Sequence, residues 1–131
     1  MTATRSSLWS EPLSREECQR HLEEATVARA LLSLRGLPAA LPARIELVDP
    51  DRLVVSSREN AVLLASRRGD VISVQIDGLD ENESTWSVTA TGVAAWASPD
   101  EFESARFKRV SDCGASLAVL PLTVVTGQRD H

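Results

Sequence analysis

Tyrosine is absent from the sequence, which has only two cysteines and two histidines among its 131 residues. Cys18 and Cys113 lie far apart in the chain, and His21 and His131 do not complete the ligand spacing of a zinc site. We therefore expect neither a disulfide scaffold nor a bound metal ion.

Catalytic motifs are also missing. The sequence contains no G-x-G-x-x-G, P-loop or H-E-x-x-H pattern. A serine or cysteine nucleophile would have to use His21 as its general base. We expect this side chain on the solvated side of a helix, where it would be a poor base. No catalytic residue is therefore predicted, and a bound cofactor must carry any reaction.

Long apolar runs and a surplus of positive charge are lacking too. No stretch approaches the roughly 20 apolar residues that a transmembrane helix needs, and the first residues lack the apolar segment of a secretory signal. We expect a cytoplasmic protein without a membrane partner. The net charge is −5, and eight acidic residues but no lysine or arginine lie between Asp70 and Ser104. Such a segment repels nucleic acid, so no nucleic-acid partner is expected.

The composition that remains is that of one folded domain. The apolar fraction is 43% and the charged fraction 25%, both close to globular averages. Residues 1–12 are polar and show no periodicity, so we assign them to a flexible N-terminal arm. Residues 13–131 form the expected domain.

Three short helices are predicted. Ser14 and Glu17 have the spacing of a capping box, which places a helix over about residues 15–25. Ser56 and Glu59 have the same spacing and predict a second helix that ends at Gly69. A third helix is expected to begin at Ser98, with a proline at its first position.

Six strands are predicted from the apolar periodicity. They are expected at residues 27–34, 38–48, 52–57, 71–76, 85–97 and 117–126. A bulge is expected at Gly92, and Pro38 and Pro42 place the second strand at an edge or pair it mainly beyond Pro42. Because most of these strands are joined by hairpins, the prediction is a mainly β fold, a small antiparallel barrel.

One cluster has the chemistry of an anion site. Ser56, Ser57 and Arg58 stand where a strand leads into the predicted second helix. Free backbone amides, two hydroxyl groups and a guanidinium group would converge there on a phosphate. A plain helix cap explains the same pattern, and both interpretations remain open.

The order and spacing of several segments resemble the pyridoxamine 5′-phosphate oxidase-like, flavin-binding split-barrel family. These segments are Ser14-Arg15-Glu16-Glu17-Cys18, the hairpin from Val27 to Pro42, the stretch from Leu53 to Ile76, Trp86-Ser87-Val88 with Gly92, and Val125-Thr126-Gly127-Gln128-Arg129. The resemblance implies a six-stranded antiparallel split β-barrel. It also implies a homodimer with one FMN in each of two clefts at the dimer interface.

The resemblance also suggests site residues. Ser56 and Ser57 stand where family members often have Arg-Thr, Val62 where a phosphate-binding lysine is usual, and Arg44 where an Asn-Tyr pair begins. Arg44 or Arg58 would restore the missing positive charge, which is a hypothesis. Trp86 and Ser87 match a Trp-Ser pair that the partner subunit contributes near the flavin. The indole either stacks on the flavin or anchors the dimer, and both alternatives stay open.

Two functions follow from the resemblance. The first is an FMN-dependent oxidoreductase that acts on a small-molecule substrate. The second is a noncatalytic dimeric binding module that has lost affinity for FMN and holds another ligand, such as a deazaflavin or haem. The substitutions at Ser56 and Val62 favour the second function, whereas Trp86-Ser87 and the overall spacing favour the first.

Overall fold

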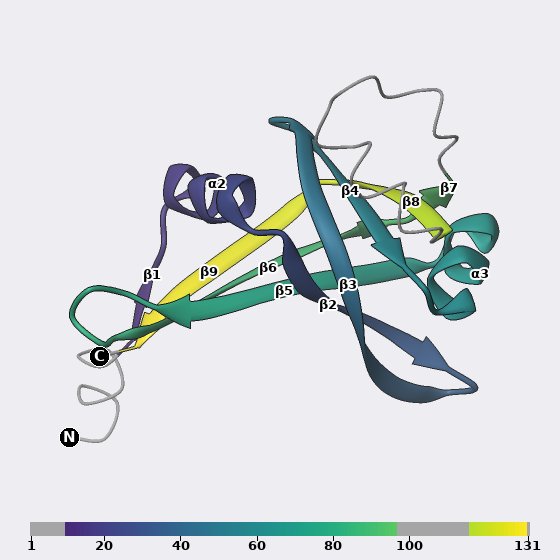
Figure 1. Cartoon of the computed structure of the whole chain (residues 1–131), viewed down its shortest axis with the longest axis horizontal. Coiled ribbons are helices and arrows are strands. Elements are labelled where there is room, and N and C mark those ends of the chain that lie inside the picture. The colour runs from purple at the N-terminus through teal and green to yellow at the C-terminus, as the bar shows by residue number, and fades with distance from the viewer. Residues whose placement is uncertain (1–9, 97–115, 131) are drawn as a thin grey trace.

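A computed structural model describes residues 10–96 and 116–130 (Figure 1). These residues form two helices and nine strands, which are β1 (Ser10–Pro12), α2 (Arg15–Glu24), β2 (Val27–Leu34), β3 (Leu37–Asp49), β4 (Arg52–Ser57), α3 (Asn60–Arg68), β5 (Val71–Leu79), β6 (Thr85–Val93), β7 (Ala95–Trp96), β8 (Ser116–Pro121) and β9 (Val124–Asp130). Neither helix is long and apolar enough to cross a membrane. The third predicted helix lies outside the described residues.

All the strands belong to one antiparallel sheet in the order β1-β9-β6-β5-β2-β3-β4-β8-β7. Because β6 and β7 are consecutive in the chain but lie toward opposite ends of this order, the sheet curls into a barrel. The pairing of β2 with β5 extends only from Arg29↔Gln75 to Leu31↔Ser73. The β2–β3 hairpin and the β5–β6 hairpin therefore diverge on either side of this short contact. The mainly β, antiparallel prediction is confirmed.

The strand count differs from the predicted six for three reasons. Residues 10–12, assigned to a loose arm, pair with β9 as strand β1. The long strand predicted over residues 85–97 is interrupted at Ala94, whose amide donates to the carbonyl of Asp70 at 2.9 Å. The strand predicted over residues 117–126 breaks after Pro121, where the amide of Leu122 donates to the carbonyl of Asp51 at 2.8 Å.

The bulge predicted at Gly92 is wrong. The pairing of β5 with β6 runs without a shift from Val71↔Val93 to Leu79↔Thr85. Glycine is needed there because another strand crosses closely: a Cβ atom on Gly92 would lie 2.6 Å from the carbonyl oxygen of Pro121. The residue therefore permits a close crossing of two strands rather than an extra residue in one of them.

The first helix begins as predicted. The Ser14 hydroxyl accepts from the Glu17 amide at 3.1 Å, and the Ser14 amide donates to the Glu17 carboxylate at 3.4 Å. This helix, α2, buries Cys18 and Leu22 against the barrel, and burial raises the pKa of the Cys18 thiol. It packs closely on β9, because a Cβ atom on Gly127 would lie only 2.5 Å from the Cys18 sulfur.

The core fills the inside of the barrel. Alternate residues of β5 point inward, and Ile72, Val74 and Ile76 are buried as their spacing predicts. Val55 on β4 and Val62 on α3 have no exposed surface and belong to the same cluster. The two helices lie at opposite ends of the barrel (Figure 1).

Candidate functional site

The end of β4 separates from β3 and leaves a hollow beside it. The two strands pair from Asp49↔Arg52 to Arg44↔Ser56. Before Arg44, β3 pairs only with β2 among the described residues. The predicted pairing mainly beyond Pro42 is wrong, because Pro38 and Pro42 pair with Ser33 and Arg29 on β2. Residues 37–43 are nevertheless paired on one side only among the described residues, which leaves the prolines, without an amide hydrogen, an unpaired side as at an edge.

The helix start predicted from Ser56 and Glu59 is wrong, because Ser56 and Ser57 both belong to strand β4. Ser56 pairs with Leu117 on β8 as well as with Arg44 on β3. The helix α3 begins at Asn60, and its N-cap residue Glu59 makes no side-chain capping bond. Its predicted end is confirmed, since Gly69 adopts the left-handed conformation there, with φ 70°.

Ser57 closes the turn between β4 and α3. Its hydroxyl donates to the carbonyl oxygen of Pro42 at 3.1 Å and accepts from the amide of Glu59 at 3.1 Å. The side chain is buried. The hydroxyl is therefore engaged within the fold, which is the serine-to-backbone bond typical of a turn.

Four of the predicted site residues surround this one hollow, here called the arginine cavity. Its volume is about 540 Å³, and it is lined by Val27, Pro42, Ala43, Arg44, Ser56, Ser57, Arg58 and Glu59. Arg44 and Arg58 are exposed, whereas Ser56 and Ser57 are buried. Within residues 10–96 and 116–130, neither guanidinium group forms an ion pair.

The charge of the arginine cavity suits an anion. Its described lining carries two guanidinium groups and one carboxylate, that of Glu59, and guanidinium groups bind phosphate through paired hydrogen bonds. The volume lies within the usual range of ligand pockets, roughly 300–1,000 Å³. The residues present therefore fit the phosphate end of a cofactor. Val62, matched to the family's lysine, has no exposed surface and takes no part.

Trp86 and Ser87 are not part of the arginine cavity. The indole of Trp86 stacks on the imidazole of His21, with 3.7 Å between ring centroids and 20° between planes. It also covers Gly78, where a Cβ atom would lie 2.7 Å from the indole ring. The prediction that His21 lies on the solvated side of its helix is wrong. Burial lowers the pKa of His21 below its ordinary value.

The His21–Trp86 stack borders a second hollow of about 650 Å³, which also includes Glu24, Leu79, Asp80, Glu81, Asn82 and Arg129. Arg129 bridges two elements there, with its guanidinium 3.4 Å from the Glu17 carboxylate and 3.2 Å from that of Asp80. The hydrogen bond from the Ser14 amide, aided by Arg129, holds the pKa of the Glu17 carboxyl below its ordinary value. These ion pairs fix β9 to α2 through Glu17 and to the β5–β6 loop through Asp80, and they were not predicted.

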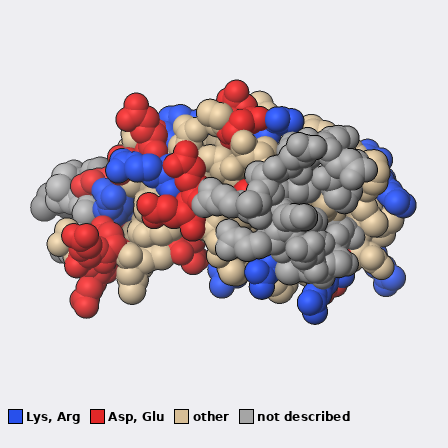
Figure 2. Space-filling view, turned by 45° about the horizontal axis from the view of Figure 1, so that its top comes forward, with Lys and Arg blue, Asp and Glu red and all other residues tan. Residues whose placement is uncertain are grey.

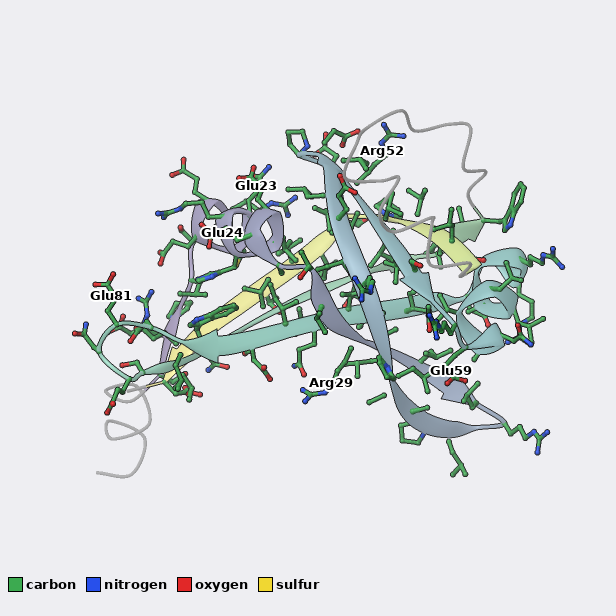
Figure 3. All side chains as sticks on the ribbon, in the orientation of Figure 1. Glu23, Glu24, Arg29, Arg52, Glu59 and Glu81 are labelled. Atoms are coloured by element: carbon green, nitrogen blue, oxygen red, sulfur yellow. The ribbon has the colours of Figure 1, made fainter. Side chains whose placement is uncertain are left out.

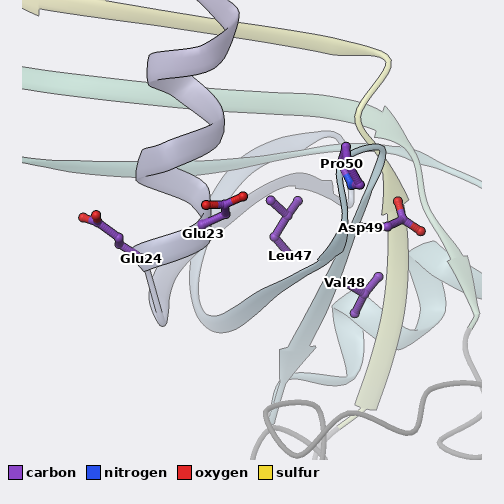
Figure 4. Close-up of a pocket in the computed structure, with 6 residues that line it drawn as sticks. All are labelled: Glu23, Glu24, Leu47, Val48, Asp49 and Pro50. Carbon is purple, nitrogen blue, oxygen red and sulfur yellow. The ribbon is translucent and has the colours of Figure 1, made fainter.

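Two other hollows lack the chemistry of a phosphate site. One, of about 380 Å³, lies between the end of α2 and the β3–β4 turn (Figure 4) and is lined by Glu23, Glu24, Leu47, Val48, Asp49 and Pro50. Its described lining has three acids and no cation. The other, of about 470 Å³, is mostly apolar and lies where β2 and β5 diverge.

Charge is also unevenly distributed over the surface. Figure 2 shows acidic side chains gathered at the end of the molecule that carries α2, with basic groups more frequent at the other end. In the part of the chain that the structure describes, no group of three or more His, Cys, Asp or Glu residues is placed to hold a metal ion. Among the four hollows described for residues 10–96 and 116–130, the arginine cavity is best suited to an anionic ligand.

Comparison with known proteins gives two kinds of match. A family model described as pyridoxamine 5′-phosphate oxidase matches residues 14–114. No curated protein matches the chain. Among solved structures, an FAD-binding protein from Mesorhizobium loti is 19% identical with a TM-score of 0.75, and the alignment covers 93% of this chain and 99% of that one.

Two further solved structures are from Mycobacterium smegmatis. An FAD-binding protein is 19% identical with a TM-score of 0.67, over 93% of this chain and 99% of that one. An FAD- and haem-binding protein is 17% identical with a TM-score of 0.71, over 93% of this chain and 73% of that one. At such identities the likeness establishes the shared fold.

Proposed function

The chain belongs to the pyridoxamine 5′-phosphate oxidase family, and on that premise we propose that it binds FMN and acts as a flavin-dependent oxidoreductase on a small molecule. The arginine cavity carries this proposal, because it brings Arg44 and Arg58 together beside the buried end of β4. The two guanidinium groups would hold the phosphate. A bound flavin supplies hydride or electron exchange, and the protein's part is to position it.

The chain's own residues would orient the cofactor. Arg44 approaches from β3 and Arg58 from the turn after β4. The Ser57 hydroxyl, bonded to Pro42 and Glu59, holds the two walls in place.

The proposed active unit is a homodimer. Ser87 points to the face of the sheet opposite the buried Val88. The same face carries the paired hydroxyls of Ser73 and Thr91, 2.7 Å apart, and the valines at 71, 93 and 124, which are 62%, 52% and 53% exposed. Apolar side chains grouped on a sheet face are typical of an interaction surface. A second copy covering this face would bring Ser87 to the partner's arginine cavity, whereas the Trp86 indole points to the other face of the sheet, where it stacks on His21.

Titration with FMN tests the cofactor. We expect binding at micromolar FMN to quench flavin fluorescence and raise the melting temperature, since a ligand at about 100 times its Kd adds about 2.7 kcal/mol of stability. Protein purified with bound flavin should absorb near about 450 nm. If micromolar FMN changes neither tryptophan fluorescence nor the melting temperature, the proposal is rejected.

Mixing of subunits tests the shared site. A chain with both Arg44→Ala and Arg58→Ala is mixed with a chain carrying Ser87→Ala, each expected to fold but to bind FMN weakly. In a mixed dimer one site has both wild-type halves, so tight binding should return to a fraction of the sites. A sedimentation mass near 14.2 kDa, that of one chain, would contradict the dimer.

A second candidate is a noncatalytic binding module. Val62 offers no cation and the Ser57 hydroxyl is already engaged, so the phosphate contacts come from Arg44 and Arg58. A module of this kind would bind FMN weakly, or hold another ligand such as a deazaflavin or haem. Mass spectrometry of small molecules released from the purified protein distinguishes the two candidates. FMN supports the first, and haem or a deazaflavin the second.

A further inference from the structure

Glu59 lines the arginine cavity, and its carboxylate does not cap the helix that begins after it. Glu59 is the N-cap residue of that helix, α3. Its backbone amide is held by the Ser57 hydroxyl at 3.1 Å. The side chain is exposed beside the start of α3 (Figure 3). In residues 10–96 and 116–130 the carboxylate forms no ion pair.

A carboxylate at this place opposes the two arginines. It lies in the same cavity as Arg44 and Arg58, so it lowers the positive potential that attracts a phosphate. A cavity that served only to bind phosphate would be better without it. The carboxylate is therefore suited to a different part of the ligand, and because it is an acceptor only, that part must carry hydrogen-bond donors.

We infer that Glu59 is a specificity-determining residue that accepts hydrogen bonds from the hydroxyl groups of a phosphorylated polyol. The phosphoribityl chain of FMN has this chemistry, with hydroxyl groups next to the phosphate. The arginines then recognise the phosphate, and Glu59 distinguishes an ester with a hydroxyl-bearing chain from bare phosphate. This inference rests on the proposed function, because it takes the arginine cavity to hold the phosphate end of a flavin.

Three variants of the full chain test this role. Glu59→Ala removes the acceptor and the charge, and Glu59→Gln removes the charge but keeps an acceptor oxygen. Glu83→Gln is the matched control, since Glu83 is an exposed carboxylate in the β5–β6 loop and lines none of the cavities described above. Because the Glu59 side chain does not cap α3, all three variants should keep the wild-type melting temperature.

The expected effects on two ligands have opposite signs. Glu59→Ala should weaken FMN binding about tenfold, in line with the loss of a charge-assisted hydrogen bond. The same variant should bind inorganic phosphate, measured as a competitor of FMN, about twofold more tightly, because a repulsive charge is gone. Glu59→Gln should increase the affinity for phosphate by the same factor, and it should lose less affinity for FMN than Glu59→Ala does. Glu83→Gln should change neither affinity.

Two results would overturn the inference. If Glu59→Ala binds FMN as tightly as the wild-type chain or more tightly, the carboxylate contacts no part of the ligand. If Glu59→Ala weakens the binding of FMN and of phosphate by the same factor, the substitution acts through the local structure and not through selectivity. Failure of the wild-type chain to bind FMN is a separate result, which removes the proposed function together with this inference.

Discussion

The hydroxyl of Ser57 joins the carbonyl of Pro42 to the amide of Glu59, with 3.1 Å to each partner. This one buried oxygen connects β3, the end of β4 and the start of α3. Ser57→Ala should therefore lower the free energy of unfolding by about 1–3 kcal/mol, because two backbone groups lose their partner. Urea denaturation measures this loss. Unchanged stability with a loss of FMN affinity would show that the hydroxyl serves the ligand instead.

The two cavity arginines should govern the affinity for FMN without supporting the fold. Arg44→Ala and Arg58→Ala are each expected to weaken FMN binding about tenfold or more, as expected when a charge-assisted bond to phosphate is lost. The melting temperature should stay the same, since neither side chain forms an ion pair within the described residues. Arg67→Ala, an exposed residue at the end of α3, is the control. Unchanged FMN affinity in both cavity variants would place the phosphate elsewhere.

Gly127 should be required for the docking of α2. A Cβ atom there would lie 2.5 Å from the Cys18 sulfur and 3.1 Å from the Leu13 Cβ. We expect Gly127→Ala to cost about 1–3 kcal/mol, the usual effect of overpacking. Cys18→Ala removes the closest obstacle, so the double variant should be less destabilised than the sum of the single variants. If the losses in the free energy of unfolding of the two single variants, measured by chemical denaturation, add up in the double variant, α2 shifts away from β9 without resistance.

The sequence predicted elements whose signals are local. The capping box at Ser14, the Arg35-Gly36 turn between β2 and β3, and the Gly69 stop of α3 each depend on a few adjacent residues. The family resemblance, which rested on the order of such segments, is confirmed by the family match. Arg58 was named from the local chemistry and Arg44 from the family resemblance, and the structure brings them to one cavity because Arg44 pairs with Ser56, two residues before Arg58.

Errors arose where distant segments decide the structure. Ser56 and Glu59 have the spacing of a capping box, but pairing with Leu117 on β8 keeps Ser56 in a strand. The strand breaks after Pro121, where the amide of Leu122 donates to the carbonyl of Asp51, and the spacing of apolar residues does not reveal this contact. The stack of His21 on Trp86 joins residues that are 65 positions apart, so the helix pattern alone placed His21 in solvent.

The His21–Trp86 stack should make stability depend on pH. Burial lowers the pKa of His21 in the folded chain, whereas the unfolded chain has the ordinary value of about 6.5. The unfolded chain therefore binds the proton more readily, and the stabilising contribution present above that value is lost as pH falls through the folded pKa. Glu24 and Glu17 oppose this shift, and Arg129 and Arg20 add to it.

The variant His21→Gln isolates this contribution, because the acidic groups that titrate elsewhere remain in both proteins. The free energy of unfolding of the wild-type chain, minus that of the variant, should be larger at about pH 7.5 than at about pH 5. Urea denaturation at the two pH values measures the difference. Protonated imidazole is also attracted to the face of an indole, which works in the opposite direction. A wild-type chain that gains stability relative to the variant on acidification would therefore show that this attraction outweighs the burial of His21.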